Sequence, residues 1–206
     1  RSTLFPYTTL FRSLFIERRR QMADAVRRIV AADGMEKVTF AHTAQEAGVS
    51  VGLVGYYFSG KDELLLFTFQ RIRERTRERV ARAMDREGTV RDQLRNCLLE
   101  FLPLDAERGT ELRVYLAFCG RAVDSARLRD VQIAVHYEVR AHLAEAIEAA
   151  QLSEEIGGHV DPDAEATALW AFVDGLALHS YTAPESLPPA AAITTLDTYL
   201  DRLFRT

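Results

Sequence analysis

Apolar side chains recur every three or four residues along most of the 206-residue chain, in segments that end at glycine or proline. In one of the longest segments, Leu65, Phe69 and Ile72 follow one another at steps of four and three. This spacing places apolar residues on one face of an α-helix, whereas no segment shows the strict alternation of a half-buried strand. The sequence therefore predicts an all-α fold.

Nine helices are expected from these periods and from residues that favour helix ends. Thr39, Ser50 and Asp161 stand where they can cap helix N-termini, and Gly34 suits the left-handed conformation that ends a helix. The expected helices cover residues 14–32, 40–47, 50–57, 61–87, 90–101, 112–119, 125–152, 162–181 and 193–203.

The first thirteen residues, RSTLFPYTTLFRS, differ in character from the rest. The string resembles the conceptual translation of a sequencing-adapter fragment, and we expect a leader foreign to the protein; a native disordered tail is the alternative. It lacks the regions of a signal peptide. The string has a central Pro6 and no helical period, and residues 1–13 are left out of the fold prediction.

Charge is distributed unevenly along the chain, whose net charge is −4. Residues 1–84 hold 15 Lys and Arg against 9 Asp and Glu, and the remainder holds 11 against 21. A basic front part indicates an anionic partner such as nucleic acid. Much of this positive charge is an arginine run over residues 71–82, which is also typical of a solvated helix face, and residues 14–70 carry seven basic and seven acidic residues.

Several function classes are disfavoured by what the sequence lacks. Cys97 and Cys119 form no CxxC pair and no disulfide framework, which favours a reducing cytoplasm. The longest apolar run, 164–181, is interrupted by charged residues and predicts no membrane span. The five histidines show no metal-binding spacing, and there is no nucleophile elbow or phosphate-binding glycine loop. We expect no metal, no cofactor and no enzymatic activity.

Residues 39–58 have the pattern of a helix-turn-helix unit. Ala44 is small where two helices approach closely, Gly48 permits a sharp turn, and Val49 and Val54 can fill the space between the helices. A short second helix with small exposed residues can enter a DNA major groove, about 12 Å wide. The spacing alone is equally compatible with an ordinary corner between two helices of a bundle.

The segment 14–69 resembles the DNA-binding domain of TetR-family transcriptional regulators. The matching motifs are the basic amphipathic first helix, Ala44…Ala47-Gly48-Val49-Ser50-x-Gly52 and Tyr57-Phe58-x-x-Lys61-Asp62-Glu63-Leu64-Leu65. The stretch 170–177 is similar to the BetI-like branch of that family. The resemblance implies a helix-turn-helix domain over 14–60 and a helical ligand-binding and dimerisation domain over 61–206, joined by the long helix.

The family implies a homodimeric repressor that a small-molecule effector releases from a near-palindromic operator in double-stranded DNA. The positions carried over as DNA-binding are Ala41, His42, Ser50, Val51, Gly52, Gly55, Tyr56, Tyr57 and Lys61. Two residues depart from the family pattern: Gly55 stands where Tyr is frequent, and Thr43 where Ile is common. An all-α ligand-binding or interaction module that has lost operator binding is therefore the alternative.

Aromatic and polar residues on the later helices predict an effector pocket that is mostly apolar with a few orienting polar groups. The candidates are Phe101, Tyr115, Phe118, Cys119, His136, Tyr137, Val139, Trp170, Phe172 and His179. Plain core packing is the alternative for each of them.

The last two helices predict a dimer interface. The eighth is apolar nearly all round, and the ninth carries a seam at steps of three and four, so two copies of each could form a four-helix bundle. The expected interface residues are Ala168, Leu169, Phe172, Leu176, Ile193, Leu196, Leu200 and Leu203.

Overall fold

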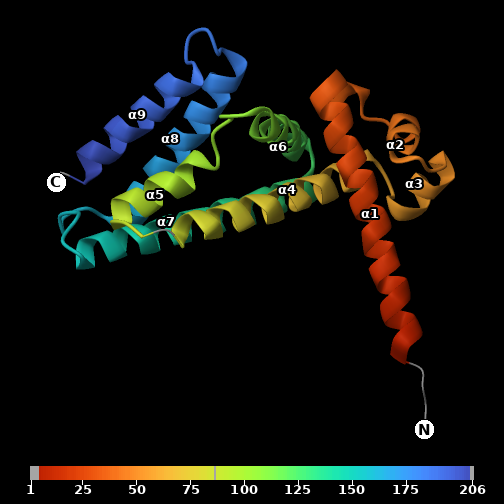
Figure 1. Cartoon of the computed structure of the whole chain (residues 1–206), viewed down its shortest axis with the longest axis horizontal. Coiled ribbons are helices and arrows are strands. Elements are labelled where there is room, and N and C mark those ends of the chain that lie inside the picture. Colours follow the sequence, from red (N-terminus) through yellow and green to blue (C-terminus); the bar gives the residue numbers. More distant parts are fainter. Residues whose placement is uncertain (1–4, 86, 205–206) are drawn as a thin grey trace. The chain divides into compact units, whose positions relative to one another are not determined.

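The computed structural model describes residues 5–85 and 87–204. These residues form nine α-helices and one short 3₁₀ helix, and they contain no strand, which confirms the all-α prediction (Figure 1). The elements are α1 (Phe5–Asp33), η1 (Met35–Lys37), α2 (Phe40–Ala47), α3 (Val51–Tyr57), α4 (Lys61–Met84), α5 (Val90–Leu99), α6 (Ala106–Asp124), α7 (Ala126–Leu152), α8 (Pro162–Thr182) and α9 (Pro189–Leu203).

The chain divides into two compact units. The first contains the residues up to Glu74 together with 113–124, and the second contains 75–112 and 125–206. Helices α4 and α6 therefore each contribute residues to both units. The functional boundary predicted after residue 60 stays a prediction.

Most helix ends lie where the sequence places them. The Thr39 side chain accepts a hydrogen bond from the His42 amide, and Asp161 accepts from the amides of Asp163 and Ala164. Pro162 occupies the first turn of α8, where its missing N–H leaves no partner unsatisfied. These caps stabilise helix ends by about 1 kcal/mol each.

The first helix begins earlier than expected. We predicted a start at Leu14 and left residues 1–13 out of the fold prediction, but the backbone of residues 5–13 continues α1 back to Phe5. Pro6 lies in the first turn, where proline is tolerated, and extending an existing helix needs no new nucleus. Residues 1–4 of the expected leader lie outside the described residues, and its foreign origin stays a prediction.

Other elements differ from expectation as well, and α9 begins at Pro189 rather than near 193. Residues 35–37 form η1, a turn too short to show a period in the sequence. Helix α6 begins at Ala106 rather than near 112. The sequence did not predict this start, because the first residues of the helix include Gly109 and several charged side chains and show no apolar period.

The core of the first unit lies among α1, α2, α3 and parts of α4 and α6. Figure 1 shows α1 beside α2 and α3. Met22, Val26 and Val54 are completely buried there. The Phe69 ring of α4 stacks on Phe118 of α6, with ring centroids 4.2 Å apart. Burial of each such side chain contributes about 1.5–3 kcal/mol.

The second unit is built around the packing of α7 against α8, with α9 covering α5 and α8. Ile147, Leu169, Leu196 and Leu200 have no exposed surface. Two ion pairs, Arg91 with Asp201 and Arg95 with Asp197, also connect α5 to α9. This unit thus holds α9 by both apolar burial and charge.

Candidate functional site

The segment α2–turn–α3 has the geometry of a helix-turn-helix. Gly48 ends α2 in the left-handed conformation (φ 66°), and its amide bonds back to the α2 carbonyls of Ala44 and Gln45. Ser50 then caps α3, because its side chain accepts a hydrogen bond of 3.1 Å from the Leu53 amide. An L side chain at position 48 would be strained, so glycine is required for this turn.

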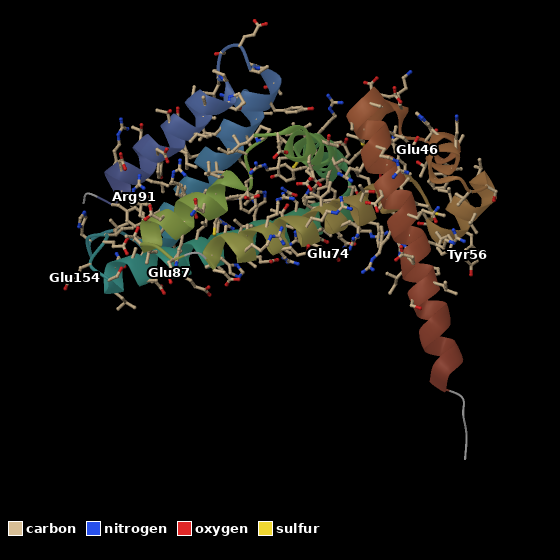
Figure 2. The ribbon with its side chains drawn as sticks, in the orientation of Figure 1. Glu46, Tyr56, Glu74, Glu87, Arg91 and Glu154 are labelled. Carbon is tan, nitrogen blue, oxygen red and sulfur yellow. The ribbon has the colours of Figure 1, made fainter. Side chains whose placement is uncertain are left out.

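One face of α3 is held in the core and the opposite face is free of the unit's own packing. Val54 is fully buried, whereas Val51 is 50% and Tyr56 is 73% exposed. Figure 2 shows Tyr56 pointing outward from α3. Ala41, Ser50, Gly52 and Gly55 are also exposed. Ser50, Gly52 and Gly55 lie at or on α3 with Val51 and Tyr56, whereas Ala41 lies on α2.

Three further predicted DNA-binding residues lie on α2, at the end of α3 and at the start of α4. Tyr57 is half-buried, and its ring lies edge-on to Tyr56 at 5.2 Å. The His42 Nδ1 atom lies 3.1 Å from the Lys37 carbonyl oxygen, and Nε2 is 3.9 Å from a carboxylate oxygen of Asp33. Lys61 is exposed at the first residue of α4.

The motif at the junction of α3 and α4 is mainly structural. Phe58 is buried, and the Glu63 carboxylate accepts hydrogen bonds of 2.8 Å from both the amide and the hydroxyl of Ser59. The other Glu63 oxygen pairs with Arg19 of α1 at 2.8 Å. The Arg19 guanidinium also lies 4.6 Å from the centre of the Phe58 ring. Sequence reasoning missed Arg19, since nothing in its local pattern distinguishes it from its arginine neighbours.

The predicted effector residues fall into both units. Tyr115, Phe118 and Cys119 belong to the first unit, where Tyr115 and Phe118 both stack on Phe69. The remaining candidates belong to the second unit, and two of these, Tyr137 and His179, are exposed there. Phe118 has no exposed surface, so packing in the core explains this aromatic side chain without a ligand.

A bonded group in the second unit contains three of the predicted residues. The Trp170 indole N–H donates a hydrogen bond of 2.8 Å to His136 Nδ1, and the Phe101 ring lies edge-on to Trp170 at 5.1 Å. His136 Nε2 lies 2.7 Å from the side-chain amide of Gln132. Because Nδ1 accepts, the neutral ring carries its proton on Nε2, and this N–H can donate to Gln132 only when the amide is turned so that its oxygen, and not its nitrogen, faces the ring. Burial lowers the pKa of His136, and the charge of Arg140 lowers it further.

A buried ionic cluster in the second unit was not predicted. Arg79 of α4 donates to Glu111 of α6 at 2.7 Å and to Glu100 at 2.9 Å, and Glu111 is only 5% exposed. Arg108 lies 3.5 Å from the same Glu100 carboxylate. Burial alone would lower the pKa of Arg79, but its bonds to Glu111 and Glu100 raise it above the usual value. The pairing joins residues far apart in the sequence and leaves no local signal.

Other features of the second unit carry less chemistry. A depression of about 470 Å³, open to solvent, is lined by Gln151, Glu154–Gly158 and Phe204, and none of the predicted effector residues line it.

Burial raises the pKa of the Cys97 thiol to about 11, with the charge of Glu100 adding to the effect, so this thiol is protonated at neutral pH. Among the described residues there is no cluster of metal-binding side chains and no helix long and apolar enough to span a membrane.

The residues expected at a dimer interface differ in how much surface a single chain leaves free. Leu196 and Leu200 are completely buried within the chain, and Leu169, Leu176 and Leu203 are also buried. Ile193 is half-buried, and Phe172 stacks on Tyr199 at 4.5 Å. Ala168 is exposed, as are Ala171 and Leu178 on the same helix. The ninth-helix seam is therefore covered by the chain's own α5 and α8.

Two protein families match separate parts of the chain. Residues 23–66 match the tetR family of bacterial regulatory proteins, and residues 90–205 match the C-terminal domain of BetI-type transcriptional repressors. The first match contains α2, α3 and the turn between them.

Individual relatives agree with the family match. The chain is 33% identical over 168 residues to the HTH-type transcriptional regulator PksA of Bacillus subtilis (strain 168), covering 82% of this chain and 80% of that protein. It is 29% identical to the HTH-type transcriptional regulator BetI of Burkholderia mallei, covering 90% and 93%. The crystal structure of a transcriptional regulator from Rhodococcus sp. Rha1 superimposes with a TM-score of 0.80 at 28% identity, covering 91% and 96%.

Proposed function

Because the chain belongs to the tetR family of bacterial regulatory proteins and is a ligand-responsive, DNA-binding transcriptional regulator rather than an enzyme, we propose that it is a repressor whose α3 reads an operator. The observation that carries this proposal is the outward face of α3. The left-handed Gly48 and the Ser50 cap fix the helix, while Val51 and Tyr56 remain exposed. A helix held in this way can enter the major groove.

Side chains on and near α3 divide by chemistry into two roles. Tyr56 and Val51 would contact base edges, where an apolar surface suits the thymine methyl group. Lys61 and the Tyr57 hydroxyl would contact phosphates and set the register, as would the His42 ring and the backbone amide of Ala41 at the start of α2. Because α3 offers no Arg, Asn or Gln for bidentate base contacts, sequence-dependent DNA shape would contribute to recognition.

A mobility-shift titration against the intergenic DNA upstream of the chain's own gene tests the operator function. The expected result is a complex that forms at lower protein concentration with this DNA than with a shuffled duplex of the same length. Equal affinity for both duplexes would favour the second candidate, a helical ligand-binding or interaction module without operator recognition. That candidate is favoured by Gly55, which leaves an exposed α3 position without a side chain, and by the balanced charge of residues 14–70.

For the effector, we propose a small molecule that is mostly apolar and binds beside Trp170 and Phe101 in the second unit. The two rings offer apolar surface, and His136 and Gln132 offer the few polar groups that orient a ligand. A panel of apolar compounds would be screened for those that raise the melting temperature. A compound that stabilises the wild type but not Trp170→Ala, and that weakens operator binding, is the expected result.

The family acts as dimers, and we propose a homodimer that uses the exposed side of α8, including Ala168 and Ala171. Two copies would place two α3 helices about 34–36 Å apart and require a near-palindromic operator. Sedimentation of Ala168→Glu should show monomers, because a charge on this exposed position opposes association without entering the core. Leu200→Glu is unsuitable, since it would bury a charge within the chain. The same DNA-binding role makes the cytoplasm the expected location.

A further inference from the structure

Phe15 of α1 makes a specific contact with a predicted DNA-binding residue. Its ring lies 4.8 Å from the Tyr57 ring, centre to centre, at an interplanar angle of 50°. The Tyr57 ring in turn lies edge-on to Tyr56 at 5.2 Å, so three aromatic rings connect α1 to the exposed end of α3. Phe15 is 38% exposed, which means that much of its ring is not part of the unit's core.

The same face of α1 fixes the chain immediately after Tyr57. Arg19, one helical turn beyond Phe15, pairs with Glu63 and lies over the Phe58 ring. Arg19 thus contacts the buried Phe58, and Phe15 contacts the half-buried Tyr57 beside it. The Arg19 guanidinium also lies 6.0 Å from the centre of the Phe15 ring. Because the Arg19–Glu63 pair and core burial also fix the backbone at Phe58, the contact of Phe15 bears mainly on the orientation of the Tyr57 side chain.

We propose that Phe15 is a positioning residue for operator binding, which holds the Tyr57 ring so that its hydroxyl faces a DNA phosphate. This inference rests on the proposed DNA-binding function and adds a residue on α1, outside the helix-turn-helix itself. A Tyr side chain has two main torsions, and an aromatic neighbour that fixes them before binding removes an ordering cost on binding. An aromatic pair of this kind corresponds to about a three- to tenfold change in affinity.

The test compares Phe15→Ala with Ile16→Ala in the full chain. Ile16 is adjacent and has the same exposed fraction of 38%, but it leaves α1 about 100° further round the helix. Operator affinity would be measured on a duplex enriched from genomic fragments by the wild-type chain. We expect Phe15→Ala to bind the operator about three- to tenfold more weakly than the wild type. Phe15→Tyr, which keeps an aromatic ring, and Ile16→Ala should both bind as the wild type does.

A double-mutant cycle separates positioning from general loss of structure. In a Tyr57→Ala background, Phe15→Ala should cause no further loss, because the side chain that it positions is absent. The same loss in both backgrounds, or an equal loss for Ile16→Ala, would overturn the proposal.

Nuclear magnetic resonance of the Tyr57 ring provides a second readout without DNA. The ring protons should shift in Phe15→Ala and not in Ile16→Ala, and unchanged Tyr57 resonances in Phe15→Ala would overturn the proposal by themselves. Failure of the underlying DNA-binding function would look different, since the wild-type chain would then enrich no genomic duplex.

Discussion

The helix-turn-helix region and the second unit are stabilised over very different sequence separations. The caps of α2 and α3 join residues three apart, such as Ser50 and Leu53. In the second unit, Trp170 and His136 are 34 residues apart, and Arg95 and Asp197 are 102 apart. The first region is specified mostly by local sequence, whereas the second depends on which helices pack together.

The two regions also place their polar groups differently. Around α3 most of the predicted contact residues are exposed, with Tyr57 half-buried, and the buried hydroxyl of Thr43 in α2 lacks a hydrogen-bond partner in the described part of the chain. In the second unit the buried carboxylate of Glu111 is fully engaged by Arg79. Substitutions of Glu111 should therefore act on stability, and those of the exposed residues on α3 should act on DNA binding.

The largest effect is expected at the buried ionic cluster. In Glu111→Ala, the partly buried charge of Arg79 would keep only Glu100 as its carboxylate partner. The free energy of unfolding should therefore fall by about 3–5 kcal/mol. Glu138→Ala is the matched control, because Glu138 pairs with the neighbouring Arg77 of α4 at an exposed site, where a pair is worth at most about 1 kcal/mol. Urea unfolding measures both, and equal losses would contradict the distinction.

Substitutions on the DNA-binding face should spare stability and change recognition. Tyr56→Ala is expected to cost about 1–3 kcal/mol of discrimination between the operator and a shuffled duplex. Lys61→Ala should instead weaken both duplexes about equally and lower the slope of log affinity against log salt by roughly one. Fluorescence-anisotropy titrations at several salt concentrations distinguish the two. A Tyr56→Ala protein that loses affinity equally on both duplexes would remove its assignment as a base contact.

A smaller, stabilising effect is expected at Thr43. Its hydroxyl is buried without a partner, so Thr43→Val should raise the free energy of unfolding by about 1 kcal/mol. Thr68 is buried in the same unit, but its hydroxyl donates to the Leu64 carbonyl oxygen at 2.8 Å. Thr68→Val should therefore give no gain. Thermal unfolding of the two variants compares them directly, and equal gains would show that the hydrogen bond of Thr68 is immaterial.

The smallest expected effect is a pH dependence from His136. Because burial and Arg140 lower its pKa in the folded chain, the unfolded chain binds more protons below about pH 6.5. Stability should thus be fully present above that pH and fall as the pH decreases toward 5. This loss of stability at low pH should be smaller in His136→Asn, whereas replacement of the exposed His142 by Asn should leave it unchanged. The measurement is the difference between the melting temperatures at pH 5 and pH 8. The same difference in His136→Asn as in the wild type would refute the assignment of this pH dependence to His136.

The sequence was sufficient for features that depend on near neighbours. Thr39, Gly48 and Ser50 were placed correctly because caps and tight turns need particular residue types at fixed positions. The exposed side of α3 also followed, since Val54 could be recognised as its buried residue.

Features that depend on tertiary packing were not accessible in the same way. We predicted the apolar seam of α9 as part of a dimer interface, whereas within a single chain α5 and α8 already cover Leu196 and Leu200, and the pattern alone does not say which surface covers such a seam. For the same reason the partners of Arg19, Arg79 and His136 could not be predicted, because each pair forms only when distant helices meet.

The bond between Trp170 and His136 gives the protein a property that no other described contact provides. Trp170 is the single tryptophan of the chain, so the indole emission spectrum comes from one ring whose N–H is bonded to one imidazole. Any event that breaks or reorients this bond changes the colour and intensity of that light. The second unit therefore carries an intrinsic optical reporter, and its state can be followed in real time without attaching a dye.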